Sequence, residues 1–373
     1  MRIAIAGKGG VGKTTLTALL ALGLFEKGYQ TLAVDSDANP NLGLSLGVSP
    51  EEASAIKTLL ELNEDSSLHS FRKGKDLREF SYKTPAGVSL TVLGRVNHAD
   101  TGCLCRAYQL LSRMFEMWGR NHEIMVLADM AAGLEYMKRG AVRYIDALLV
   151  VAEPYFRSMQ SAVQLKNLAE QLNIKHVYGV INKVRDEEDQ RLVEEFFSNN
   201  KLKLIASLPF DERLAEAHDL TVTSGDAVWA PVRKVISQIE SDHRANLLSH
   251  LIFSLSEKFL LATPSDLSQR EILAVRYLAK EGQMTMSELA RSIKAAYSTA
   301  TAVIDNLARK KFVRRVSGAQ DRRVVLVSLS DSGKEFYKDH VDAYENLIRT
   351  MTRSLNKEEE SKLLKLVQKI STK

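Results

Sequence analysis

Gly7-Lys8-Gly9-Gly10-Val11-Gly12-Lys13-Thr14-Thr15 follows directly on an apolar run, residues 3–6, near the start of this 373-residue chain. Its spacing is that of the phosphate-binding pattern G-x-x-x-x-G-K-[ST], in which glycines let backbone N–H groups close around an anion. The helix expected next, over residues 13–27, points its positive end at the same place. We therefore predict an ATP or ADP site whose contacts come from Gly9, Gly10, Val11, Gly12, Lys13, Thr14 and Thr15.

Three side chains of this motif carry specific expectations. Lys13 would reach the terminal phosphates, and the Thr14 hydroxyl would bind Mg²⁺. Lys8, directly after the first glycine, resembles the second lysine of the deviant Walker A family, which includes cell-division and partition ATPases, the nitrogenase iron protein and nickel-insertion ATPases. The resemblance implies a dimer that closes on ATP, with Lys8 reaching the partner's nucleotide. The alternative is that Lys8 is a solvated loop charge.

The periodicity of the chain indicates two domains, as its length also does. Residues 1–240 alternate apolar runs with amphipathic stretches, which is typical of a doubly wound α/β domain with a parallel sheet. From about residue 242 helical periodicity dominates, broken by a strand pair at 312–317 and 324–329. We assign residues 1–240 to a P-loop ATPase domain and residues 241–373 to a mostly helical domain. The strands expected in the first domain are residues 2–6, 31–34, 89–93, 123–128, 147–152, 176–181 and 202–206.

Charge is shared unevenly between these domains. Residues 241–373 hold 23 Lys+Arg against 16 Asp+Glu, a net charge of +7, whereas residues 1–240 hold 28 against 30, a net charge of −2. This asymmetry suggests a polyanion partner for the C-terminal domain. No stretch approaches the roughly 20 apolar residues of a membrane span, and no signal peptide is recognisable, so we expect a cytoplasmic protein with no membrane partner.

Two strand ends supply carboxylates near the expected nucleotide. Asp35 and Asp37 end the second strand; on the family's pattern Asp37 positions the attacking water, and Asp35 supports the metal side. The alternative is that this pair caps the following turn. Asp129 ends the apolar run 126–128 and would hold Mg²⁺ through water. The next residues resemble a switch segment of nickel-insertion ATPases that carries a glutamate where this chain has Ala131, so we expect slow ATP hydrolysis.

The base of the nucleotide is expected to lie against two loops. Asn182 and Lys183 look like the family's purine-contacting pair, and the segment 207–210, with Pro209, resembles its base-side loop.

Cys103 and Cys105 are the two cysteines of the chain. A disulfide across so small a loop is implausible, whereas two thiolates supply half of a tetrahedral S₄ site. A two-fold dimer would supply the other half. The context, residues 93–96 and 101–105 together with 128–133, resembles the CooC-type ATPases that serve nickel insertion into carbon monoxide dehydrogenase. That resemblance implies Zn²⁺ or Ni²⁺ bridging two protomers; a bridging [4Fe–4S] cluster and ordinary buried thiols stay open as alternatives.

The C-terminal domain carries signals of DNA binding. Capping-box spacing at Ser268 and Glu271, and again at Thr285 and Glu288, predicts two helix starts. A third helix has Ala300, Val303, Ile304 and Leu307 on one face, which leaves small polar residues for a major groove. Residues 291–323 hold nine Lys/Arg against two acids, and Asp321-Arg322-Arg323 occupies the tip of the strand pair. The DNA-contacting residues we expect are Ser298, Thr299, Thr301, Asn306, Arg314, Arg315, Arg322 and Arg323.

This order of helices and basic wing resembles the MarR family of winged helix-turn-helix repressors. Lys311 departs from it, because glycine is usual at the end of the recognition helix, and we expect a strained C-cap or a shifted wing there. In that family the outer helices, here about residues 244–261 and 334–369, form the dimer interface. A two-fold dimer would present two recognition helices to half-sites of an operator in double-stranded DNA. A protein-binding winged helix with a solvated basic face is the alternative.

Together these features favour an ATP-responsive and metal- or cluster-responsive transcription regulator that acts as a homodimer. The runner-up is a nickel metallochaperone ATPase whose winged domain docks a metalloenzyme client. A partition-type ATPase that binds DNA nonspecifically is the third hypothesis.

Overall fold

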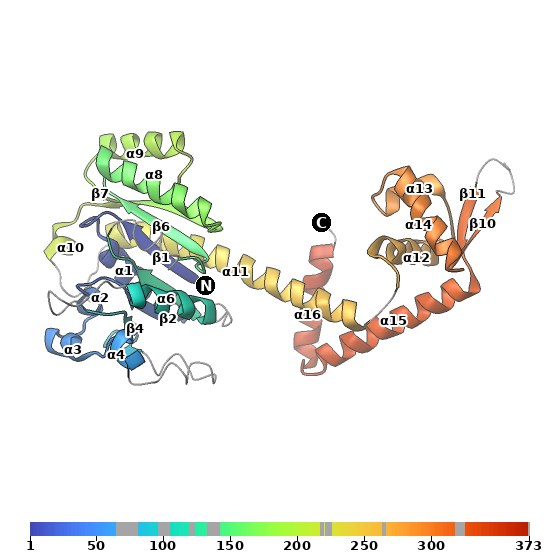
Figure 1. The fold of residues 1–373 in the computed structure, drawn as a ribbon, viewed down its shortest axis with the longest axis horizontal. Coiled ribbons are helices and arrows are strands. Elements are labelled where there is room, and N and C mark those ends of the chain that lie inside the picture. The colour runs from blue at the N-terminus through green and yellow to red at the C-terminus, as the bar shows by residue number, and fades with distance from the viewer. Residues whose placement is uncertain are drawn as a thin grey trace. The chain divides into compact units, whose positions relative to one another are not determined.

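The computed structural model describes residues 1–64, 81–95, 105–118, 124–132, 142–216, 220, 226–262, 266–317 and 325–371. These divide into two compact units, Met1–Leu247 and Leu248–Lys373 (Figure 1). The helix α11 (Asp226–Ala262) begins in the first unit, spans the boundary predicted between residues 240 and 241, and ends in the second unit. The functional division into residues 1–240 and 241–373 stays a prediction.

The first unit is built on an eight-stranded sheet of order β3-β4-β2-β5-β1-β6-β7-β8. All seven strands predicted from the sequence are present, with ends that differ by at most three residues. The strands are β1 (Arg2–Gly7), β2 (Gln30–Asp35), β3 (Tyr82–Lys83), β4 (Ser89–Val92), β5 (Ile124–Asp129), β6 (Ala147–Ala152), β7 (His176–Val184) and β8 (Lys203–Pro209).

One strand corrects the expected wholly parallel sheet. β3 pairs antiparallel with β4 through Tyr82 and Leu90, so the sheet is mixed, although its other neighbouring strands run parallel. A two-residue strand has too little length to show a period of two in the sequence. Its turn closes where Gly87, with a φ of +83°, donates its N–H to the Thr84 carbonyl at 2.9 Å.

Helices cover both faces of this sheet because both faces of its central strands are apolar. On β1, Ile3 and Ile5 pack into one core with α1 and the start of α11, whereas Ala4 and Ala6 pack into the other with α6, α8 and α9 (Figure 1). The helices of this unit besides α11 are α1 (Lys13–Glu26), α2 (Leu42–Ser45), α3 (Pro50–Ala55), α4 (Leu59–Glu64), α6 (Cys105–Trp118), α8 (Phe156–Gln171), α9 (Glu187–Asn199) and α10 (Glu212–Glu216).

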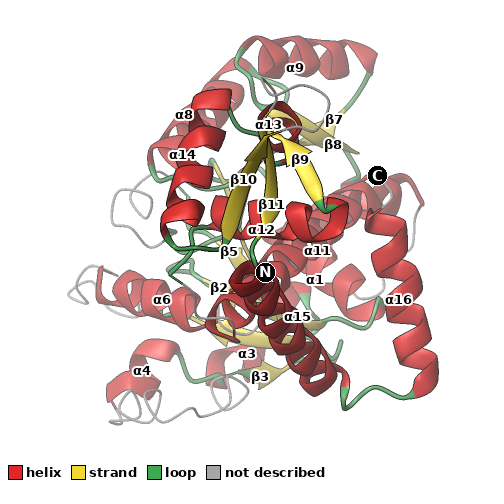
Figure 2. Cartoon of the chain, turned by 90° about the vertical axis from the view of Figure 1, so that its right-hand side faces the viewer, coloured by secondary structure: helices red, strands yellow, loops and turns green. Residues whose placement is uncertain are grey.

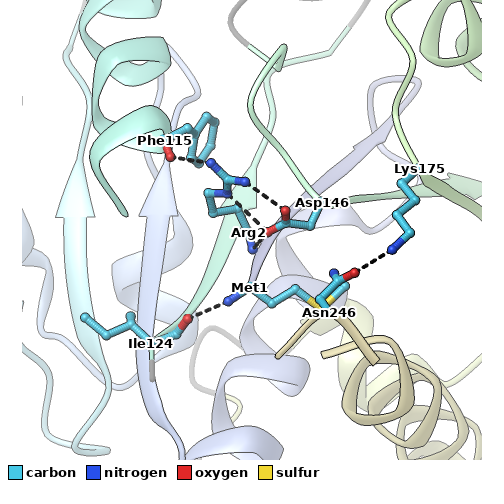
Figure 3. Close-up of polar contacts among 7 residues, drawn as sticks. All are labelled: Met1, Arg2, Phe115, Ile124, Asp146, Lys175 and Asn246. Atoms are coloured by element: carbon cyan, nitrogen blue, oxygen red, sulfur yellow. Dashed lines mark hydrogen bonds and ion pairs between the residues drawn. The ribbon is translucent and has the colours of Figure 1, made fainter. Parts of the chain in front are cut away.

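The start of β1 is held by a cluster of polar contacts that Figure 3 shows. The Met1 ammonium donates to the Ile124 carbonyl at 2.8 Å. The Arg2 guanidinium meets both carboxylate oxygens of Asp146, at 3.1 and 2.8 Å, and the Phe115 carbonyl at 2.7 Å. Arg2 thereby joins β1 to the start of β6 and the end of α6.

The second unit is a winged-helix unit with a small antiparallel sheet of order β10-β11-β9, as Figure 2 shows. Both predicted capping boxes are confirmed: Glu271 N–H donates to Ser268 Oγ at 3.4 Å and Glu288 N–H to Thr285 Oγ1 at 3.2 Å. The strand β9 was not predicted, because three residues ending in a helix cap leave no alternating pattern. The elements are α12 (Gln269–Glu281), β9 (Gln283–Thr285), α13 (Met286–Ser292), α14 (Tyr297–Arg309), β10 (Val313–Ser317), β11 (Val325–Leu329), α15 (Asp331–Thr352) and α16 (Lys357–Ser371).

The expected outer helix over residues 334–369 was wrong, because α15 and α16 are separate helices. Asn356 separates them by capping α16: its Oδ1 accepts the N–H groups of Glu358 and Glu359, both at 3.0 Å. The Glu359 carboxylate accepts the Asn356 N–H in return, at 2.9 Å.

The Arg2–Asp146 contact makes stability depend on pH. Burial alone would raise the pKa of Asp146, but the hydrogen bonds and charge of Arg2 outweigh it and hold that pKa below the ordinary 3.8. Because the pKa of Asp146 is lower in the folded state, the contact stabilises the fold fully at pH values above the pKa of the unfolded state. This stabilisation is lost as the pH falls through the pKa of the folded state. We expect Asp146→Asn to lower the free energy of unfolding at pH 7 by about 1–3 kcal/mol. Urea denaturation at pH 7 and at about pH 3 measures this, and a difference that does not shrink at low pH contradicts it.

Candidate nucleotide site and DNA interface

The glycine loop after β1 has the backbone geometry that a phosphate cradle requires. Gly10 and Gly12 have φ values of +79° and +91°, which glycine adopts without strain. Gly12 also caps α1, and a Cβ on it would lie 2.1 Å from Nδ2 of Asn182. A Cβ on Gly7 would lie 2.3 Å from the Val151 carbonyl oxygen. The loop is therefore closed tightly against β6 and β7 at the carboxyl edge of the sheet.

Thr14 and Asp129, both expected to hold Mg²⁺, are brought together from α1 and β5. The Thr14 hydroxyl donates to Asp129 Oδ2 at 2.5 Å. Asp129 Oδ1 is buried and has no hydrogen-bond partner among the described residues. Burial raises the pKa of Asp129, and the charge of Asp35 raises it further, while Thr14 and Lys13 oppose the shift. A cation beside Asp129 would offset the cost of this buried charge.

Lys13 is buried, with 8% of its surface exposed, and its Nζ donates to the carbonyl of Lys8 at 3.2 Å. Lys8 itself is exposed, and its Nζ lies 5.5 Å from the centre of the Tyr155 ring. Tyr155, in the loop between β6 and α8, was not predicted from the sequence. This contact is a cation–π arrangement within one protomer.

Asp35 and Asp37 behave differently from each other. The buried Asp35 carboxylate accepts the N–H of Leu42 at 2.8 Å and that of Asp37 at 3.2 Å. These bonds fit the turn-capping interpretation of Asp35; its support of the metal side stays a prediction. Asp37 is half-buried, and its Oδ1 accepts the N–H of Asn39 at 3.1 Å.

A cavity of about 250 Å³ adjoins the glycine loop. Asn182 Nδ2 donates to the Val11 carbonyl at 2.9 Å, and Lys183 Nζ donates to the Gly10 carbonyl at 2.8 Å. Lys183 has a φ of +63° and pairs with Glu153 Oε1 at 2.5 Å. Glu153 was also missed, although it follows a buried strand as Asp129 does. The lining residues are Gly10, Gly12, Thr15, Leu16, Val151, Val180, Asn182, Lys183, Leu208, Pro209, Phe210, Asp211 and Leu214.

Cys103, Arg322 and Arg323 lie outside the described residues, as does the side chain of Cys105, the first residue of α6. The metal or cluster prediction and the wing-tip prediction therefore stay predictions.

The third helix of the winged unit, α14, has the two faces expected of it. Its buried residues are Ala300, Val303, Ile304 and Leu307. Ser298 is exposed, and Thr299, Thr301 and Asn306 are half-buried. Two of these polar groups have local partners: the Thr301 hydroxyl donates to the Tyr297 carbonyl at 3.0 Å, and Asn306 Oδ1 accepts from Arg309 at 2.6 Å.

The strand arginines are also engaged within the unit. Arg315 Nη2 lies 2.5 Å from Asp305 Oδ1 on α14, and Arg314 Nε donates to Ser328 Oγ at 3.3 Å. The Asp305 contact joins β10 to α14 and partly neutralises the charge of Arg315. The sequence pattern did not reveal it, because the two residues are ten positions apart.

The strained C-cap expected at Lys311 is confirmed. Lys311 has a φ of +64°, in the left-handed region that favours glycine. Its N–H bonds the Ala308 carbonyl at 3.0 Å, and the N–H of Phe312 bonds the Leu307 carbonyl at 2.9 Å. This pair of bonds is a Schellman motif, completed without glycine.

These geometries define a P-loop nucleotide-binding unit followed in the same chain by a winged-helix unit. The family model described as "CobQ/CobB/MinD/ParA nucleotide binding domain" matches residues 3–222, and the chain belongs to this family. The MarR family model matches residues 267–325. Both resemblances drawn from the sequence are thereby confirmed.

Two relatives are each similar to more than half of this chain. The carbon monoxide dehydrogenase accessory protein CooC of Rhodospirillum rubrum is 32% identical over 258 residues, which is 64% of this chain and 97% of that protein. An uncharacterized ATP-binding protein of Methanocaldococcus jannaschii is 32% identical over 231 residues, 59% of this chain and 89% of that protein.

Two solved structures are each similar to part of this chain. The cell-division protein MinD of Aquifex aeolicus aligns at 22% identity over 64% of this chain and 96% of its own, with a TM-score of 0.49. The YusO protein of Bacillus subtilis aligns at 22% identity over 36% of this chain and 96% of its own, with a TM-score of 0.33. Within the part of the chain that the structure describes, no helix combines the length and apolar character of a membrane span.

Gly12→Ala should abolish ATP binding. The added Cβ meets Asn182 Nδ2 at 2.1 Å in a conformation with a φ of +91°, so the loop must open where it would hold phosphate. Gly28→Ala is the matched control, because Gly28 also has a positive φ, +87°, but a Cβ there would meet no atom of the described residues within 4 Å. Titration with a fluorescent ATP analogue measures both variants. Unchanged affinity of Gly12→Ala would show that this loop is not the nucleotide site.

Lys311→Gly should raise the free energy of unfolding of the winged unit by about 0.5–1 kcal/mol. Relief of left-handed strain of about 1–2 kcal/mol is partly offset by the greater unfolded-state entropy of glycine. The neighbouring Lys310→Gly should lower stability, because Lys310 has a φ of −78°. Denaturant melts of both variants test the difference, and equal effects contradict it.

Proposed function

We propose that this protein is an ATP-binding transcription regulator that binds operator DNA as a homodimer, and that nucleotide binding alters its DNA affinity. The observation that carries the proposal is the presence, in one chain, of a closed glycine loop and of a winged helix with a polar exposed face. The family matches to residues 3–222 and 267–325 support the same pairing.

In this proposal the nucleotide phosphates lie against the backbone N–H groups of residues 9–15, at the positive end of α1. Lys13 reaches the terminal phosphates, and Lys8 reaches the nucleotide of the partner protomer. Thr14 and Asp129 hold Mg²⁺, and Asp129 Oδ1, which has no hydrogen-bond partner in the described part of the chain, is a suitable oxygen ligand for it. Bound Mg²⁺ neutralises charge on the β- and γ-phosphates.

The remaining roles around the nucleotide are assigned by position. Asp37 orients the attacking water, and Ala131, in place of an acid, keeps hydrolysis slow. Asn182 and Pro209 contact the base side of ATP or ADP, within the cavity beside the glycine loop.

DNA is contacted by α14 and the wing. Ser298, Thr299, Thr301 and Asn306 approach base edges in the major groove. The arginines of the strands and wing tip, Arg314, Arg315, Arg322 and Arg323, contact phosphates or the minor groove.

The homodimer is supported by apolar side chains exposed on two helices. On α11, Leu248, Leu251, Ile252 and Phe253 are 52–64% exposed. On α16 the exposed apolar residues are Leu363, Leu364, Leu366, Val367 and Ile370. A second copy that covers these faces would bring two recognition helices to two half-sites.

Cys103 and Cys105 are proposed to form a regulatory metal or cluster site between two protomers. Two thiolates from each of two protomers form the donor set that Zn²⁺ or a [4Fe–4S] cluster prefers, and Ni²⁺ is the third candidate. Metal and iron–sulfide analysis after anaerobic purification, with Cys105→Ser for comparison, tests this site.

A second candidate function is a metallochaperone ATPase that delivers nickel to a metalloenzyme client. It is favoured by the 32% identity to the Rhodospirillum rubrum protein named as a carbon monoxide dehydrogenase accessory protein. In that case the winged unit would dock the client rather than DNA.

We expect the affinity for a selected operator fragment to differ between the apo, ADP and MgATP forms of the protein. Lys13→Ala should remove this difference while leaving apo affinity intact, because Lys13 lies in the glycine loop of the first unit and is proposed to bind nucleotide phosphate rather than DNA. Combined Arg322→Ala and Arg323→Ala should lose DNA binding, whereas Lys334→Ala, whose charge pairs with Asp331, should not. Fluorescence anisotropy at fixed salt measures all four proteins. Equal operator affinity in every nucleotide state, with and without metal, would contradict the proposed function.

A further inference from the structure

β7 contacts the phosphate-binding loop at one end and α11 at the other. Near its carboxyl end, Asn182 and Lys183 donate to the carbonyls of Val11 and Gly10, at 2.9 and 2.8 Å. The clash that a Cβ on Gly12 would make with Asn182 shows how little space separates them. A rearrangement of the loop around phosphate therefore has to displace these two side chains of β7.

The backbone of β7 is irregular where it reaches this loop. Its register against β8 shifts between Ile181 and Val184, and Lys183 has a φ of +63°. A bulge of this kind re-aims side chains, and a non-glycine residue in the left-handed region is held there by its surroundings. Here the surroundings are the Gly10 carbonyl and Glu153.

About 17 Å away along the strand, Tyr178 binds α11 through a buried polar cluster. Its hydroxyl donates to Asp242 Oδ2 at 2.8 Å. The Gln238 amide donates to the Tyr178 hydroxyl at 3.1 Å and to Asp242 Oδ1 at 3.0 Å. His176 Nδ1 lies 3.8 Å from Asp242 Oδ2. Tyr178 and Asp242 each expose only 7% of their surface.

Burying this polar cluster costs more free energy than apolar packing would, if the cluster only holds α11 against the sheet. α11 already buries Val228, Val232, Val235, Ile236 and Ile239 against the same core. A buried carboxylate adds a desolvation cost that an apolar residue would avoid, but its directional bonds fix the position of the helix. Burial and the hydrogen bond to Asp242 raise the pKa of Tyr178 above its ordinary value, so its hydroxyl stays a donor.

We propose that β7 couples nucleotide binding to α11, and that the hydrogen bonds among Tyr178, Gln238 and Asp242 connect the two elements. This inference rests on the proposed function, because it concerns how nucleotide binding reaches the DNA-binding unit. α11 is one uninterrupted helix through Leu247 and Leu248, where the two units meet in the sequence. A shift imposed on residues 238–242 is therefore passed along helical backbone into the second unit.

The competing route runs through α1, which also begins at the glycine loop. Its contacts with α11 near the helix end include Lys27 Nζ to Glu240 Oε2 at 2.7 Å and the Tyr29 hydroxyl to Glu240 Oε1 at 3.2 Å. Lys27 is 45% exposed, and ion pairs in that setting contribute little. Buried hydrogen bonds to a charged group contribute more, which favours β7.

The test is hydrogen–deuterium exchange of the full chain with and without MgATP, read on peptides from residues 244–262 and 269–309. The unaltered protein should show an ATP-dependent change in uptake there. Tyr178→Phe and Asp242→Asn should lose that change while their ATP affinity stays that of the unaltered protein. Lys27→Ala is the matched control on the α1 route and should keep the change. If Tyr178→Phe lacks a cooperative thermal transition, Gln238→Met takes its place.

The possible results distinguish failure of the proposed ATP response from failure of the proposed role of β7. No ATP-dependent change in the unaltered protein contradicts the proposed ATP response itself. A change that persists in Tyr178→Phe and Asp242→Asn overturns the role of β7 and leaves the proposed function standing. A change lost in Lys27→Ala but kept in Tyr178→Phe overturns it as well and assigns the coupling to α1.

Discussion

The closure of the glycine loop at the carboxyl edge of the sheet is the constraint from which the rest of the first unit follows. Gly7 lies so close to the Val151 carbonyl, and Gly12 so close to Asn182, that neither position has room for a side chain. The loop can close in this way only if β1 lies between β5 and β6, with β7 next in order. The same arrangement delivers Asp129 from β5 and Lys183 from β7 to the two sides of the loop.

Two buried carboxylates at this edge of the sheet indicate where a cation would be held. Asp35 and Asp129 are both buried, and each carboxylate is costly without a cation or hydrogen-bond donors. The backbone around residues 37–42 satisfies Asp35, whereas one oxygen of Asp129 keeps no partner among the residues described. This difference, rather than the number of acids, indicates where a divalent cation would be held. In the second unit basic residues outnumber acidic ones, and some basic side chains are partly neutralised by nearby acids, as Arg315 is by Asp305.

Long apolar strands and helix caps could be predicted from the sequence, because local chemistry determines them. The run 147–152 and the capping pair Ser268 and Glu271 are examples. Short elements such as β3 and β9 could not be predicted, since two or three residues show no period. The break between α15 and α16 was missed although Asn356 and Glu359 have capping-box spacing.

The motif residues of the nucleotide site were predictable for the same reason, but their partners were not. Tyr155, near Lys8, and Glu153, paired with Lys183, come from a loop about 150 positions away from the glycine loop. Asp242, which binds Tyr178, is 64 positions away from it. Such pairings depend on how strands are ordered in the sheet, which single-residue patterns do not encode.

If nucleotide and DNA act on one another through this chain, their coupling must be reciprocal. Calorimetric titration of MgATP into the protein, alone and saturated with operator DNA, measures that coupling most directly. We expect DNA to change the ATP dissociation constant by the same factor by which ATP changes the DNA dissociation constant. An ATP dissociation constant that is identical with and without DNA would contradict it.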